Sequence, residues 1–94
     1  MNNIFGLIKA AYHFRKNKNK CLKFNNNSEE YKLAKYYDDY FKKKEHEEIN
    51  VVDINNLAQQ VIDHQARYEN SDEIQRLLTS TLDFLDVLKD FVKH

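Results

Sequence analysis

The sequence predicts an all-α fold, a small antiparallel four-helix bundle, on three observations. The chain of 94 residues contains one Gly and no Pro, whereas β-sandwiches and barrels need these residues at many tight turns. Charged residues make up 32% of the chain and hydrophobic residues 41%, which suits amphipathic helices. Four stretches with helical spacing of apolar residues are separated by short polar breaks, which favour antiparallel neighbours. The alternative is a three-helix core with a loosely attached N-terminal helix, and in either case we expect residues 1–94 to form one domain.

The first expected helix covers about residues 3–24. Its apolar residues at helical spacing are Ile4, Leu7, Ile8, Ala11 and Phe14, with Phe5 and Tyr12 on the flank. Its second half is basic and rich in Asn, and the run 25–27 of three Asn residues favours a break.

The second expected helix covers about residues 28–48. Ser28 alone, or Asn27 together with Glu30, is expected to cap its N-terminus. Its apolar stripe consists of Leu33, Tyr36, Tyr37, Tyr40 and Phe41. The segment 49–52 that follows is interpreted as a buried connector, because a single short extended piece has no partner strand.

The third and fourth expected helices cover about residues 53–69 and 71–93, with Asp53 and Ser71 as their N-caps. The apolar residues of the fourth helix advance by alternating steps of four and three, which is typical of a bundle seam. The residues predicted to be buried together are Ile54, Leu57, Val61, Ile62, Ile74, Leu78, Leu85 and Leu88.

The chain lacks the patterns that indicate catalysis, metal binding or a cofactor. The four histidines, His13, His46, His64 and His94, contain no pair at His-x-x-x-His spacing, and Cys21 is alone. Gly6 is the only glycine, so a Gly-rich phosphate loop is excluded. We therefore expect a non-enzymatic protein that needs no cofactor and no metal.

Compartment is indicated by three further absences. One cysteine cannot form an intramolecular disulfide, which favours a reducing compartment. The N-terminus does not have the pattern of a signal peptide, and no stretch approaches the ~20 apolar residues that span a bilayer. We expect a cytoplasmic protein.

Charge is distributed unevenly although the formal net charge is zero. Residues 1–24 contain no acid, and their bases are Lys9, Arg15, Lys16, Lys18, Lys20 and Lys23. Two interpretations stay open. The first helix either binds an acidic partner, an anionic membrane or nucleic acid, or it lies against the more acidic third and fourth helices of its own chain.

By elimination, the expected function is protein–protein binding, of the inhibitor, immunity factor, adaptor or secretion accessory type. The expected contacts are Tyr31, Tyr36, Tyr37 and Tyr40 on the second helix, with Arg15, Lys16, Lys18 and Lys20 on the first. Four tyrosines span too wide an arc to be buried in one stripe, and tyrosine is enriched at interfaces. The alternative is that most of them are ordinary core. Membrane-surface or nucleic-acid binding through the first helix, and a homodimer, are the alternative partnerships.

Overall fold

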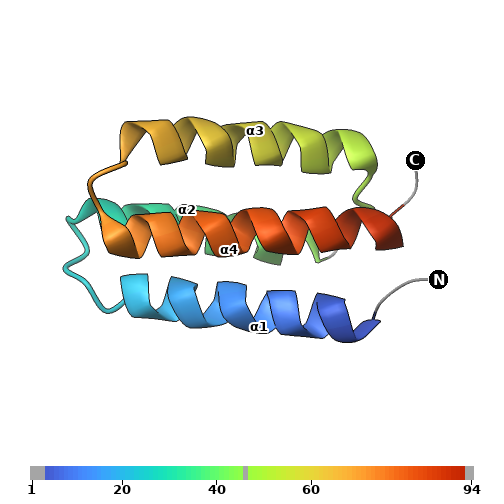
Figure 1. Ribbon diagram of the computed structural model, residues 1–94, viewed down its shortest axis with the longest axis horizontal. Coiled ribbons are helices and arrows are strands. Elements are labelled where there is room, and N and C mark those ends of the chain that lie inside the picture. The colour runs from blue at the N-terminus through green and yellow to red at the C-terminus, as the bar shows by residue number, and fades with distance from the viewer. Residues whose placement is uncertain (1–3, 46, 93–94) are drawn as a thin grey trace.

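Four helices pack side by side, each running antiparallel to the next in sequence (Figure 1). The computed structural model describes residues 4–45 and 47–92. The helices are α1 (Ile4–Cys21), α2 (Glu29–Lys44), α3 (Val51–Arg67) and α4 (Asp72–Leu88), and a 3₁₀ turn, η1 (Lys89–Phe91), follows α4. The prediction of an all-α four-helix bundle is confirmed. The three-helix alternative is wrong, because α1 packs more extensively against α4 than any other pair of helices does.

The helix starts follow from side-chain caps, two of which were predicted. The Ser28 and Ser71 hydroxyls accept hydrogen bonds from the backbone N–H groups of Tyr31 and Ile74. The prediction for α3 was wrong by three residues. Asn50 is its N-cap, and Asp53 sits three residues later, where its carboxylate accepts from the Asn50 N–H in a reciprocal capping box. Helix α3 therefore begins inside the segment interpreted as a buried connector, and Val52 is exposed.

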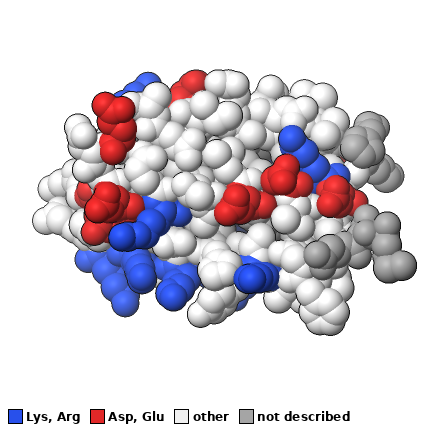
Figure 2. All heavy atoms as spheres, in the orientation of Figure 1, with Lys and Arg blue, Asp and Glu red and all other residues white. Residues whose placement is uncertain are grey.

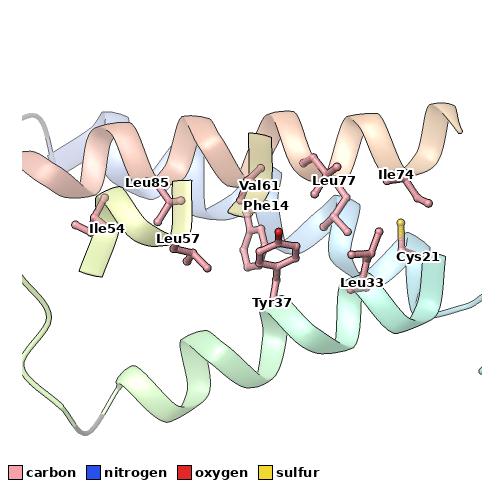
Figure 3. Close-up of a cluster of buried hydrophobic side chains, with 12 residues drawn as sticks. Phe14, Cys21, Leu33, Tyr37, Ile54, Leu57, Val61, Ile74, Leu77 and Leu85 are labelled. Carbon is pink, nitrogen blue, oxygen red and sulfur yellow. The ribbon is translucent and has the colours of Figure 1, made fainter. Parts of the chain in front are cut away.

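The core is formed by apolar side chains from all four helices, which point into the space between them (Figure 3). Six of the eight predicted core residues are buried: Ile54, Leu57, Val61, Ile74, Leu78 and Leu85. Leu88 is only half-buried, and Ile62 is 47% exposed. The Ile62 prediction was wrong because one residue turns an α-helix by about 100°. Burying Val61 therefore places the next side chain on the flank.

Two further buried residues explain how α1 is anchored. Cys21 is almost completely buried, and its thiol donates to the Glu73 carbonyl at the start of α4 with an S···O distance of 3.7 Å. Phe14 stacks on Phe84 of α4, with ring centroids 5.8 Å apart and planes at 11°. Together with Ala10, these residues define the face of α1 that meets the rest of the bundle.

Candidate functional site

The side of α1 that faces away from the bundle carries an apolar surface. The buried residues of α1 are Ala10, Phe14 and Cys21, and at 100° per residue Phe5, Ile8 and Tyr12 lie on the opposite side. These three side chains are 81%, 59% and 54% exposed, and Ile4 beside them is 50% exposed. The helical spacing grouped Ile4 and Ile8 with Phe14 in one apolar stripe, but the fold leaves both residues exposed. The first helix has two apolar stripes, and the fold buries the one that contains Phe14 and Cys21.

The same outward side becomes basic toward the C-terminal end of α1. Lys16, Lys20 and Lys23 are exposed there and, with Tyr12, Arg15 and Asn19, line a shallow depression of about 360 Å³. Within residues 4–45 and 47–92, these lysines and Arg15 form no ion pair. Figure 2 shows the Lys and Arg atoms gathered over this half of α1, while the N-terminal half is mainly uncharged. We call the outward face of α1 the residues Phe5, Ile8, Tyr12, Lys16 and Lys20 together with Lys23, which follows the end of the helix.

Lys18 differs from the other predicted basic contacts because the fold uses it internally. Its ammonium lies 2.9 Å from the carboxylate of Asp38 on α2, and its side chain is only 14% exposed. Lys42 pairs with the other Asp38 oxygen, also at 2.9 Å. Burial raises the pKa of Asp38, but the hydrogen bonds from Lys42 and Lys18 outweigh burial and the pKa lies below its ordinary value.

The self-complementation interpretation is met in position but not in ion pairing, since α1 lies against the acidic α4. Lys18 pairs with α2, and among the described residues no ion pair joins a base of α1 to an acid of α3 or α4. The basic end of α1 thus lies on the bundle without being neutralised by it.

The four tyrosines predicted as contacts differ in how far they are exposed. Tyr37 is completely buried, so it is not available to a partner, and its hydroxyl lies 2.6 Å from His64 Nδ1. Tyr31 and Tyr40 are half-buried. Tyr36 is 44% exposed and donates a hydrogen bond to the Gln60 side chain on α3.

Tyr36 belongs to a groove of about 430 Å³ between α2 and α3, to which α1 contributes no residue. Tyr68 lines the same groove and donates to Glu29 across it at 3.0 Å. Tyr36 and the basic end of α1 therefore line different depressions.

The described residues contain neither a metal-ligand cluster nor an activated thiol. They contain no group of three or more His, Cys, Asp or Glu residues able to hold a metal ion. Burial, followed by the charges of Glu30 and Glu73, raises the pKa of the Cys21 thiol to about 11, so it stays protonated at neutral pH. His46 and His94 lie outside the described residues. No described helix is long and apolar enough to cross a membrane.

Comparisons with known proteins leave the function to be argued from these residues. No protein-family model matches the chain, and neither the curated proteins nor the solved structures contain a significant match.

The outward apolar face was missed by the sequence analysis, although a signal for it existed. Ile4, Ile8 and Tyr12 are spaced by four, which is a stripe of its own beside the one through Leu7 and Phe14. Because these residues were grouped as one stripe, the number of apolar residues on this helix was not recognised as more than one buried face can hold.

Proposed function

We propose that this protein is a non-enzymatic, cytoplasmic binding module that acts by attaching to an acidic partner protein through the outward face of α1. The classes of function that fit are those of inhibitors, immunity factors, adaptors and secretion accessories. The tyrosine-bearing α2, initially expected to be the main contact, becomes the second candidate surface through Tyr36.

One observation carries this proposal: Phe5, Ile8 and Tyr12 are exposed together, next to Lys16 and Lys20 of the same helix, which form no ion pair with any described residue. Contiguous exposed apolar side chains are uncommon on monomeric proteins and mark interaction sites. Protein interfaces place aromatic and aliphatic anchors at the centre with a polar rim around them. A basic rim selects a partner that is acidic around an apolar recess.

The surroundings of α1 favour a protein over a bilayer or nucleic acid. Helix α4 lies directly beside α1 and carries exposed acids, which Figure 2 shows on the same view as the basic cluster. Asp83 shares a depression with His13 of α1. A bilayer or nucleic acid, whose surface is uniformly anionic, would be repelled by these carboxylates. A protein surface can carry charges of both signs and can therefore complement both α1 and α4.

Quantitative affinity capture from cells that naturally make the protein tests this proposal. The wild type and a Phe5→Ala/Ile8→Ala double variant serve as baits, and Val52→Ala is the matched control, since Val52 is as exposed on α3 as Ile8 is on α1. We expect one protein to be enriched by the wild type and by Val52→Ala and lost from the double variant. Each interface anchor truncated to Ala typically weakens binding by more than about 1 kcal/mol. Equal enrichment by all three baits would contradict the proposal.

The basic end is tested by reversing Lys16, Lys20 and Lys23 to Glu while leaving Lys18, because Lys18 pairs with Asp38. The proposal predicts loss of the captured protein with an unchanged melting temperature. Flotation with vesicles of phosphatidylglycerol and of phosphatidylcholine accompanies this experiment. If the wild type captures no protein but floats with the anionic vesicles alone, the membrane-surface alternative replaces the proposal.

A further inference from the structure

The side of α1 that faces away from the bundle has the seven-residue repeat of a coiled coil. Five exposed residues advance along the helix by three, four, three and four positions: Phe5, Ile8, Tyr12, Arg15 and Asn19. These are the a and d positions of a heptad repeat, and we call the five residues the α1 seam. In Figure 1, α1 lies at the edge of the bundle, with α2 and α4 on one side of it and no described element on the other.

Three lysines at seven-residue intervals flank the α1 seam. Lys9, Lys16 and Lys23 occupy the e positions of the same repeat, where the side chains of a coiled coil form ion pairs with the neighbouring helix. All three are exposed, and none forms an ion pair within residues 4–45 and 47–92. This flank of the seam is therefore cationic and can pair with acidic side chains from outside the chain.

The spacing of the α1 seam favours a helix over an extended strand as the segment that docks on it. Seam residues recur about every 3.5 residues, which is about 5 Å along the helix axis. Side chains on one face of a β-strand are about 7 Å apart, so a strand would lose register with the seam after about two contacts. A helix with the same repeat stays in register over the whole seam, which extends for about 21 Å.

A second copy of the chain does not supply the acids that this helix needs. Residues 1–24 contain no acid. Two antiparallel α1 helices would set the e-position lysines against one another, and two parallel ones would set them against Ile4, Ala11 and Lys18. Since neither arrangement neutralises the lysines, the helix that docks here belongs to a different, acidic protein.

We propose that the partner docks on the α1 seam as a single amphipathic helix. Its apolar residues lie against Phe5, Ile8 and Tyr12, and its Asp or Glu residues pair with Lys9 and Lys16. Amphipathic helices are a recurrent mode of recognition, with anchors at intervals of three and four residues. Asn19 is a polar residue at an a position, the kind that fixes the register of paired helices. This inference rests on the proposed function, because it names the kind of segment through which the acidic partner binds.

A synthetic peptide of three heptads, with Leu at the a and d positions and Glu at the e and g positions, is the probe. Repulsion between its Glu side chains keeps the peptide from pairing with itself. Titrated into the full-length protein, it should bind 1:1 by calorimetry, gain helical circular dichroism and shift the amide NMR signals of the α1 seam.

Two control peptides separate helix recognition from attraction between charges. One has the same composition with Leu at every second position, and the other has Lys in place of Glu. Both should bind at least about tenfold more weakly than the probe. Equal binding of the alternating peptide, absence of binding by the probe, or NMR shifts centred on another helix would overturn the inference.

Charge reversal on the protein locates the contact. Lys9→Glu/Lys16→Glu replaces two exposed e-position cations and should weaken binding of the probe at least about fivefold, because attraction becomes repulsion. Lys32→Glu/Lys43→Glu makes the same change in net charge at exposed positions of α2, and its affinity should stay within about twofold of the wild type because distant surface charges are screened. Equal losses in the two variants would contradict the proposed seam.

The capture experiment described above distinguishes failure of this inference from failure of the proposed function. If the wild type recovers a protein that Phe5→Ala/Ile8→Ala loses, while the probe peptide does not bind, the outward face of α1 binds a protein by a segment other than a helix. The inference then fails and the proposed function stands.

Discussion

The Tyr37 hydroxyl, on a completely buried side chain, is hydrogen-bonded to His64. A completely buried tyrosine needs a partner for its hydroxyl, and His64 Nδ1 supplies it at 2.6 Å. Burial raises the pKa of the Tyr37 hydroxyl, so the phenol stays protonated. Which of the two groups donates depends on the tautomer of His64, and burial favours the neutral form of this imidazole. No feature of the sequence pairs these two residues, which are 27 positions apart.

This contact predicts a pH dependence of stability. Burial, followed by the charge of Arg67, lowers the pKa of His64 below 6.5, and Asp63 opposes them only in part. The unfolded chain then binds more protons than the folded one at mildly acidic pH, so stability rises with pH there. The contribution of neutral His64 is complete above about pH 6.5 and is lost as the pH falls from there through the folded-state pKa.

Urea unfolding at pH 8 and pH 5 measures this effect, with His64→Gln as the control, because Gln offers an acceptor but does not titrate. The free energy of unfolding of the wild type should fall more between the two pH values than that of the variant. Parallel losses in the two proteins would assign the pH dependence to other groups.

At the scale of helices, the sequence predicted where each helix lies in the chain better than it predicted which face of the helix is buried. Helix α4 has the strictest apolar spacing, and its cap and most of its buried face were predicted correctly. The N-cap of α3 was misplaced because Asn50 and Asp53 both have capping side chains, and only the backbone decides which one starts the helix. The rotation of α1 was missed because its apolar residues form two stripes. Stacking of Phe14 on Phe84, a tertiary contact, decides which stripe is buried.

The observed rotations predict opposite outcomes for two aliphatic truncations. Leu78 is completely buried in α4, and replacing a buried Leu with Ala typically costs about 2–5 kcal/mol. Ile62 is 47% exposed on α3, so Ile62→Ala should change the free energy of unfolding by less than about 1 kcal/mol. Chemical denaturation of both variants measures the difference. Equal losses would mean that α3 is rotated relative to the structure described above.

At the scale of the whole molecule, a chain with no net charge presents a basic end on α1 beside an acidic α4. The basic cluster was predictable because residues 1–24 contain no acid. Its separation from Tyr36 was not predictable, since it depends on Tyr36 facing α3 rather than α1. The depression between α1, α2 and α4 that Phe14, Phe41 and Phe84 line could not be predicted either, because these phenylalanines come from three different helices.

Site-specific photo-crosslinking in cells that naturally make the protein tests the proposed function most directly. A photoreactive phenylalanine analogue replaces Phe5 or Tyr12 on the outward face, Tyr36 in the α2–α3 groove, or Val52 on α3, all of which are exposed. We predict that one discrete protein adduct forms from positions 5 and 12, that positions 36 and 52 do not form it, and that it disappears when Lys16, Lys20 and Lys23 are reversed to Glu. An adduct from position 36 alone would assign the contact to the tyrosine-bearing helix. Lipid adducts alone from positions 5 and 12 would contradict protein binding through this face.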